Sequence, residues 1–411
     1  MATIQKRGGS FKINVSCGYS VDGKQVRQTM TYKPEKGMTE AQIKKEVQRQ
    51  AVMFEEKCKQ GQVTAAVKFE EFATQYLTEV APLKLKAGTL VNYSNYTKRV
   101  YSSIGHMKLD KISPRDIQRF INDMSEGEYN KRTKGKLSAK SIKNHIAFIS
   151  SIYEHAIRMQ VISHNPCKAV TLPKANKQDI EIYSVEETQK ILGLLFQEDV
   201  KNFHYAVYFI LAVFTGFRRG ELLGLEFKDI DFDRQIITLN RTSLYTKKKG
   251  VYADTPKTHT SYRALKLPAE IITILSDYKA HQQAYIESVG DKWVTKIKGL
   301  NDEMVDNDRL FTTWNGRPMY QSTPSKYFKK FCERHGITYR KNHSLRHFNA
   351  SVQINAGVDV KTVSMNLGHS QASTTLNIYC KVFQSAQAAS MDKIVDVIGI
   401  PSKTPQTPQT S

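Results

Sequence analysis

Four short blocks in the C-terminal half of the chain contain residue types that could act together on a phosphate. The first, residues 215–225, has the sequence TGFRRGELLGL, and the second is TPKT at 255–258. The third is HSLRH at 343–347, and the fourth is LGHS at 367–370, followed by Tyr379. Arginine offers a planar, permanently charged fork that matches phosphate oxygens, and histidine transfers protons near neutral pH. Together these types indicate phosphate chemistry.

Each block also fits an ordinary structural role when it is taken alone. An arginine beside a glutamate, as at Arg218 and Glu221, commonly forms a surface ion pair. A lysine in a polar hairpin is usually solvated, and a histidine on a half-apolar helix usually satisfies a local hydrogen bond. A single tyrosine such as Tyr379 commonly belongs to the core or its rim. The functional hypothesis therefore depends on the set.

The whole set, in this order and with these glycines, resembles the tyrosine recombinase family, which includes phage and mobile-element integrases and chromosome-dimer recombinases. The family pattern is Arg, Lys, His-x-x-Arg, His or Trp, and Tyr, and the resemblance is strongest over residues 180–400. It implies the catalytic residues Arg218, Lys257, His343, Arg346, His369 and Tyr379, with Glu221 in support. The neighbouring Arg219 and His347 fall outside the pattern.

These residue types suit transfer of a DNA phosphodiester. Arg218 and Arg346 would donate to the non-bridging oxygens, where negative charge grows in the transition state. The phenol of Tyr379 has an ordinary pKa of ~10 and needs a base, for which His343 is the best candidate. Lys257 would protonate the leaving 5′ oxygen. The resulting 3′-phosphotyrosyl link conserves bond energy, so we expect no cofactor, no ATP and no metal; the sequence has no Walker loop and no carboxylate cluster.

The elements that would position these residues form a mixed, mainly helical catalytic domain at 180–400 with a small antiparallel sheet. A capping box of Ser184 and Glu187 begins a helix, and the apolar run 206–214 predicts a buried helix that ends at Gly216. Helices resume near Ser325. Three segments are strand candidates: 236–239, 264–267 and 309–313.

Two further domains precede it, so the predicted fold class is α+β and multidomain. Residues 1–64 contain alternating strands, 11–17 and 25–32, then a helix that begins with the capping pair Thr39 and Gln42. Residues 65–173 have helical spacing throughout, with helices starting near Thr89, Ser113 and Ser138. The resemblance implies an arm-site DNA-binding module and a core-site DNA-binding domain, respectively. Residues 401–411 form a low-complexity tail.

The composition favours a polyanionic partner. Lys plus Arg number 61 against 39 Asp plus Glu, a formal net charge of +22, which favours nucleic acid over an anionic membrane surface. No run of ~20 uncharged residues spans a bilayer, and the N-terminus lacks a secretion signal, so we expect a bacterial cytoplasmic, nucleoid-associated protein. Five scattered cysteines indicate reduced thiols rather than disulfides or zinc.

A basic cluster at 126–143 could line DNA, although a solvated charge run explains that segment equally well, and the lysines at 247–249 in the polar hairpin are further candidates. The candidate DNA-binding residues are Lys131, Arg132, Lys134, Lys136, Lys140, Lys247, Lys248 and Lys249. Residues 385–400 place apolar side chains at near-helical spacing, and this segment would pack either on a neighbouring protomer or on its own domain.

The favoured hypothesis is a site-specific integrase of a phage or conjugative element. Its partners would be double-stranded DNA attachment sites, three more copies in a homotetramer on two DNA sites, and accessory DNA-bending or excision proteins. The alternatives are a DNA-binding regulator that keeps the fold without cutting, a relaxing topoisomerase, and a resolvase of chromosome or plasmid dimers.

Overall fold

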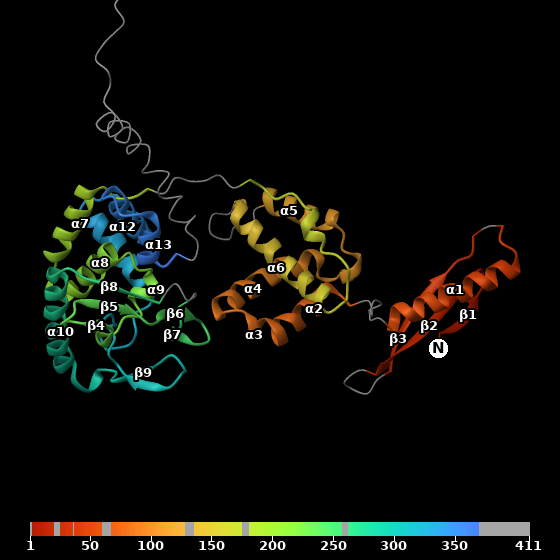
Figure 1. Cartoon of the computed structure of the whole chain (residues 1–411), viewed down its shortest axis with the longest axis horizontal. Coiled ribbons are helices and arrows are strands. Elements are labelled where there is room, and N and C mark those ends of the chain that lie inside the picture. The colour runs from red at the N-terminus through yellow and green to blue at the C-terminus, as the bar shows by residue number, and fades with distance from the viewer. Residues whose placement is uncertain are drawn as a thin grey trace, which may run out of the picture. The chain divides into compact units, whose positions relative to one another are not determined.

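The computed structural model describes residues 2–19, 25–35, 37–59, 67–127, 135–174, 181–256 and 262–369. The chain divides into two compact units, Met1–Lys177 and Gln178–Ser411 (Figure 1). Helices dominate, and every sheet is small and antiparallel, which confirms the predicted α+β class.

The N-terminal module is a three-stranded sheet with one helix on a single face (Figure 1). Its elements are β1 (Thr3–Arg7), β2 (Ser10–Tyr19), β3 (Gln25–Tyr32) and α1 (Glu40–Lys59). Alternation along β2 turns Ile13 and Val15 into a small core with Phe54 of α1. The predicted hairpin and the predicted helix are confirmed, whereas β1 was not predicted.

The helical region of the first unit has a core of its own. Its α-helices are α2 (Phe69–Gln75), α3 (Ala81–Lys84), α4 (Ala87–Val100), α5 (Pro114–Glu126) and α6 (Ala139–Arg158). Ser113 and Asp116 form a capping box at the start of α5, as the sequence predicts. On α6, Ile142, Ile146 and Ile149 recur at helical spacing and are buried, which explains why that face packs inward.

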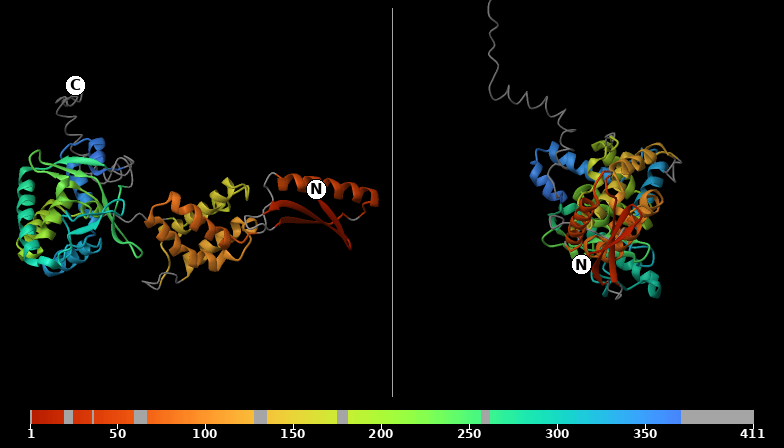
Figure 2. Two further views of the ribbon diagram at one scale, coloured as in Figure 1. Left: turned by 90° about the horizontal axis from the view of Figure 1, so that it is seen from below. Right: turned by 90° about the vertical axis from the view of Figure 1, so that its right-hand side faces the viewer.

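The second unit is built around α8, whose residues 206–213 are all buried. Figure 2 shows α10 (teal) along the outer edge of this unit. Its helices are α7 (Val185–Phe196), α8 (Phe203–Thr215), α9 (Arg219–Leu222), α10 (Ala269–Val289), α11 (Thr323–Arg334), α12 (His343–Asn355) and α13 (Val360–Leu367). Ser184 and Glu187 cap α7 as predicted.

Three small sheets complete this unit. Its strands are β4 (Ile230–Asp231), β5 (Ile236–Leu239), β6 (Thr242–Thr246), β7 (Gly250–Asp254), β8 (Arg263–Lys266), β9 (Lys296–Lys298) and β10 (Met304–Asp306). The predicted strands 236–239 and 264–267 correspond to β5 and β8, which pair with each other, while β6 and β7 form a separate hairpin between them.

The predicted strand at 309–313 is wrong. This segment makes only isolated bridges, Glu226 with Arg309 and Thr312 with Pro318. Leu310 and Phe311 are fully buried in the core, so their apolar character reflects packing rather than a sheet ladder. In the part of the chain that the structure describes, no helix has both the length and the apolar character needed to cross a bilayer.

Candidate active site

The turn after α8 places Arg218 beside the end of α13. Gly216 follows the last residue of α8 and adopts a left-handed φ of 61°. A Cβ atom there would lie 2.5 Å from Leu367 Cδ2 and 2.8 Å from Asn349 Oδ1, so both the conformation and the space require glycine. The chain then reverses into α9, and Arg218 stands immediately before its first residue.

Arg218 is held by a carboxylate on one side and by a backbone carbonyl on the other. Its Nη1 donates to Glu221 Oε1 at 2.7 Å, and its Nη2 donates to the carbonyl oxygen of Gly368 at 2.9 Å. The Arg218 backbone N–H also donates to Glu221 Oε2 at 2.8 Å, which fixes the first turn of α9. The Arg218 side chain remains 40% exposed, so it can still meet a ligand from solvent.

Arg346 of α12 reaches the same place from the interior. Its Nη1 donates to the Gly216 carbonyl oxygen at 2.7 Å and its Nη2 to the Leu367 carbonyl oxygen at 2.6 Å. Carbonyls at helix C-termini carry partial negative charge and attract cations. Burial, and then the charge of Arg218, lower the pKa of Arg346 to about 9. Arg346 is therefore a buried cation, still charged at neutral pH, beside a second cation.

Two of the predicted histidines, His343 and His369, lie in the same electrostatic environment. Loss of hydration, followed by the charges of His347, Arg346 and Arg218, lowers the pKa of His343 to about 4. Loss of hydration and then the charges of Arg346 and Arg218 lower the pKa of His369 to about 4 as well. Both imidazoles are consequently neutral at pH 7 and can accept a proton.

Glu221 links the predicted residues to one that the sequence did not single out. Its Oε2 accepts from Arg263 Nη2 at 2.8 Å, and the Arg263 guanidinium carbon lies 4.5 Å from the centroid of the Phe217 ring. Arg263 is the first residue of β8, and its side chain is only 7% exposed. Local sequence gave no signal for it, because its partner is 42 residues away.

A second buried ionic cluster contacts the backbone that follows α9. Glu226 pairs with Arg241 at 3.0 Å and with Arg309 at 3.4 Å, and Asp229 pairs with Arg241 as well. Arg309 Nη1 also donates to the Gly224 carbonyl oxygen at 2.6 Å, two residues beyond the end of α9. This cluster fixes the backbone that follows Arg218, and sequence reasoning missed it too.

Two of the six predicted catalytic residues, Lys257 and Tyr379, lie outside the described residues. Their roles stay predictions, as does the docking of segment 385–400. The structure brings Arg218, His343, Arg346 and His369 together. Among the described residues, no group of three or more His, Cys, Asp or Glu side chains is arranged to hold a metal ion.

The predicted DNA-binding residues are placed unevenly. Lys131, Arg132 and Lys134 lie outside the described ranges. Lys136 and Lys140 are exposed at the start of α6, and Lys247, Lys248 and Lys249 are exposed at the turn between β6 and β7. Lys249 pairs with Asp302 at 3.2 Å, so part of its charge is already satisfied within the protein.

A cavity of about 460 Å³ adjoins the cluster. His343 and Arg346 line it, together with Arg219, Lys341 and Ser325. Neither Arg219 nor Lys341 forms an ion pair with a carboxylate of the described residues. This wall of the cavity therefore has surplus positive charge suited to an anion.

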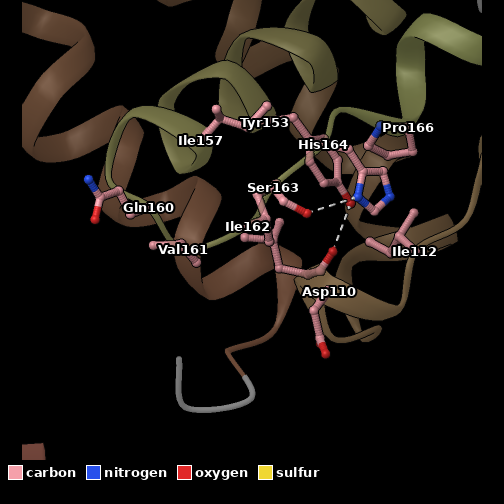
Figure 3. A pocket seen from close by; sticks show the side chains of 11 residues that line it. Asp110, Ile112, Tyr153, Ile157, Gln160, Val161, Ile162, Ser163, His164 and Pro166 are labelled. Carbon is pink, nitrogen blue, oxygen red and sulfur yellow. Dashed lines mark hydrogen bonds between the residues drawn. The ribbon is translucent and has the colours of Figure 1, made fainter. Parts of the chain in front are cut away.

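A larger cavity of about 840 Å³ lies in the helical region of the first unit and lacks such a cluster (Figure 3). The Tyr153 hydroxyl donates to the Leu109 carbonyl oxygen at 3.2 Å, and burial raises the pKa of this phenol. In Figure 3, the Asp110 side chain points away from His164. Asp110 pairs with Lys111 at 3.3 Å. The chemistry therefore belongs to the second unit.

Comparison with known proteins agrees with this placement. The model of the phage integrase family matches residues 184–385, and the model of the phage integrase N-terminal SAM-like domain matches residues 68–125. A XerC-like tyrosine recombinase from Caldanaerobacter subterraneus is 30% identical over 405 residues, which cover 94% of this chain and 96% of the relative. The ICEBs1 integrase of Bacillus subtilis is 24% identical over 97% of this chain and 100% of its own.

A solved structure shares the fold. It is a Tn1549 transposon integrase in complex with a circular intermediate DNA, with a TM-score of 0.63 and 21% identity over 80% of this chain and 99% of that chain. The sequence match to the XerC-like relative extends over nearly the whole of both proteins. This chain therefore belongs to the phage integrase family of tyrosine recombinases, which are DNA strand-exchange enzymes.

Proposed function

We propose that this chain is an integrase that inserts a mobile element or prophage into DNA, and excises it, through a 3′-phosphotyrosyl intermediate at Tyr379. The observation that supports this most directly is the convergence of Arg218 and Arg346 on the ends of α8 and α13. Two cations with one adjacent carboxylate, Glu221, favour binding of an anion at this position.

In the proposed reaction, the phosphodiester lies between the two guanidinium groups, which bind its non-bridging oxygens. The Oη atom of Tyr379 bonds to phosphorus as the bond from phosphorus to the 5′ oxygen breaks. His343 takes the phenol proton, because its low pKa keeps it neutral before the substrate binds. Lys257 gives a proton to the 5′ oxygen, and His369 donates a hydrogen bond to the phosphate. Rejoining reverses these steps with a new 5′ hydroxyl.

Basic residues around the cluster would hold the DNA. Arg219 and Lys341 line the adjoining cavity and would contact flanking phosphates, while Lys247 and Lys248 extend the basic surface on the hairpin of β6 and β7. Lys136 and Lys140 would play the corresponding part in the core-site domain. The helix α1 covers one face of the N-terminal sheet. The opposite, polar face of the sheet, which includes Asn14, is the candidate surface for arm-site DNA.

The assembly would be a homotetramer on two DNA attachment sites, since exchanging two duplexes requires four strand cleavages. Accessory DNA-bending or excision proteins would set the direction. The setting would be the bacterial cytoplasm, on the nucleoid.

The names of several relatives support a mobile element: the ICEBs1 integrase, the integrase of Staphylococcus phage L54a and the Tn916 transposase of Enterococcus faecalis. A resolvase of chromosome or plasmid dimers is the second candidate, favoured by the XerC-like relative.

The test uses the full chain and a nicked duplex that carries the recognition site. We expect wild type to accumulate a covalent protein–DNA adduct and Tyr379→Phe to form none while still binding the duplex. A covalent adduct with Tyr379→Phe would reject the assignment of the nucleophile. Strand exchange between two sites then distinguishes an integrase from an enzyme that only relaxes supercoils, because the latter forms adducts but no recombinant product.

A further inference from the structure

One carboxylate lies between two guanidinium groups at the beginning of α9. Glu221 Oε1 accepts from Arg218 Nη1 at 2.7 Å, and Glu221 Oε2 accepts from Arg263 Nη2 at 2.8 Å. Glu221 and Arg263 are both buried, whereas the Arg218 side chain is 40% exposed. Two cations thus share one anion, and the solvent-facing cation is the one predicted to bind phosphate.

We propose that Arg263 is a positioning residue for strand cleavage, which shares the charge of Glu221 and so leaves Arg218 both correctly oriented and electrostatically available to the phosphate. The inference rests on the proposed role of Arg218. Without Arg263, Glu221 would be neutralised by Arg218 alone, and the pair would present little net charge to a phosphate. With Arg263, the trio keeps one net positive charge.

The geometry fixes Arg263 tightly enough for this role. Its guanidinium stacks on the ring of Phe217, the residue before Arg218, with a distance of 4.5 Å from the guanidinium carbon to the ring centroid. Its backbone belongs to β8, where it pairs with Leu239 of β5. Arg263 therefore connects the sheet to the residues on both sides of Arg218 in the chain.

The electrostatics point the same way. Burial alone would raise the pKa of Glu221, but the charge of Arg263, and after it that of Arg218, holds this pKa below its usual value. The charge of Arg263 also contributes to the lowered pKa of Arg346. The field of Arg263 thus reaches both arginines of the candidate site.

The competing explanation is that Arg263 merely ties β8 to α9. A purely structural contact would affect the free energy of unfolding, but it would not change the pH dependence of the cleavage rate. Loss of the strongest cationic partner of Glu221 should raise the pKa of that carboxyl. Glu221 orients Arg218 only when ionised, so cleavage in the variant should fail at a higher pH than in wild type as the pH is lowered.

The experiment measures single-turnover cleavage of the nicked duplex by the full chain, at saturating protein, between about pH 5 and 8. For Arg263→Gln we expect a cleavage rate about 10- to 100-fold lower, with DNA affinity nearly unchanged and the acidic limb of the pH profile moved to higher pH. Arg263→Lys keeps the charge and should restore the acidic limb to its wild-type position.

Arg241→Gln is the matched control, because Arg241 is also a buried, ion-paired arginine of the same unit but contacts Glu226 and Asp229 instead of Glu221. Its thermal unfolding should shift while the acidic limb stays in place. The charge-sharing role is rejected if the acidic limb of Arg263→Gln lies at the same pH as in wild type. It is also rejected if Arg263→Lys shifts the acidic limb as far as Arg263→Gln does.

A double-variant cycle covers the case in which Arg263→Gln folds poorly. With Glu221→Gln as background, the carboxylate charge is gone and no buried anion is left unpaired, so adding Arg263→Gln should cost little further activity; a further loss of about 10- to 100-fold would contradict the proposal. Failure of the proposed function would be recognised by a different result. In that case Tyr379→Phe would still form the covalent adduct, whatever the variants of Arg263 do.

Discussion

One buried ionic cluster includes Glu221 of α9 and another contacts the backbone just after this helix, and the two differ in charge balance. Around Glu226, two buried carboxylates, Glu226 and Asp229, meet two buried guanidiniums, those of Arg241 and Arg309, and the exposed Lys228 pairs with Glu226 as well. The other cluster has three arginines, Arg218, Arg263 and Arg346, for the single carboxylate of Glu221. The buried charges of the first cluster are equal in number, whereas the second has an excess of positive charge over the carboxylates of the described residues, which an external anion would neutralise.

This difference separates scaffolding from binding. A buried cluster with equal charges is costly to break, because removing one partner leaves the other charge buried and unpaired, and so it fixes the backbone. A cluster with excess cations lowers the stability of the folded protein, and a bound phosphate would restore that stability by neutralising the charge. Such local destabilisation is typical of sites under selection for activity. Burial first, and then the same excess of positive charge, lower the pKa values of His343 and His369 to about 4.

The largest expected effect comes from removing one cation of the unbalanced cluster. Arg346→Gln should lower the rate of covalent adduct formation about 100- to 1000-fold, because a donor to the developing charge is lost. Its free energy of unfolding should stay the same or rise, because burial and Arg218 already oppose the charged form of Arg346. Single-turnover cleavage and urea unfolding measure the two quantities.

The paired variant Arg309→Gln should behave in the opposite way. Breaking a buried ion pair leaves Glu226 with one partner fewer and should cost about 3–5 kcal/mol of stability. Cleavage by the folded fraction should change little, since Arg309 contacts the Gly224 carbonyl rather than the candidate site. Should Arg346→Gln prove the more destabilised of the two, the distinction between the clusters is wrong.

A smaller effect concerns pH. Because His343 has a pKa of about 4 in the folded chain and an ordinary value of 6.5, the unfolded chain binds its proton first as pH falls. Its contribution to stability is therefore lost as pH falls from 6.5 towards 4. His343→Gln should flatten the decline of the unfolding temperature in that window, and duplex DNA should reduce the decline in wild type by adding negative charge.

The exposed His106 of the other unit provides the control for losing any one histidine. His106→Gln should leave the pH dependence of the unfolding temperature as it is in wild type. An unchanged slope in His343→Gln would show that neither burial nor the cations of the unbalanced cluster lower the pKa of this imidazole.

The unequal success of the sequence predictions follows from the range of the interactions. Ser113 and Ser184 cap helices through partners three residues away, so their helices could be predicted from local sequence. Arg218 and Arg346 were found because the order and spacing of the four blocks resemble the motif of the tyrosine recombinase family. Arg263 could not be found, because a partner 42 residues away is brought to it only by the pairing of β5 and β8.

The error at 309–313 has the same origin. A short apolar segment fits a strand or a buried irregular segment equally well when only its pattern is known. In the structure, Leu310 and Phe311 pack into the core, and Arg309 is held by Glu226. The balanced cluster thus determines a local conformation that residues 309–313 do not encode by themselves.

The smallest expected effect compares two adjacent lysines on the hairpin of β6 and β7. Lys249 pairs with Asp302, whereas Lys248 forms no ion pair with the described residues. These two lysines therefore allow a paired and an unpaired cation to be compared at the protein surface. Lys248→Ala should weaken duplex binding and reduce the slope of log affinity against log salt by about 1, if this lysine contacts one phosphate.

Lys249→Ala should change that slope less, because the ion pair with Asp302 already neutralises part of the Lys249 charge, although an exposed pair of this kind is worth only about 0–1 kcal/mol. Fluorescence anisotropy of a labelled duplex across a salt series measures both slopes. Equal slopes for the two variants would mean that Asp302 releases Lys249 when DNA binds, and that pairing within the free protein does not determine which cations serve the DNA. A larger change of slope for Lys249→Ala than for Lys248→Ala would mean that the paired lysine is the one that contacts DNA. The contrast between paired and unpaired cations would then not apply to this hairpin.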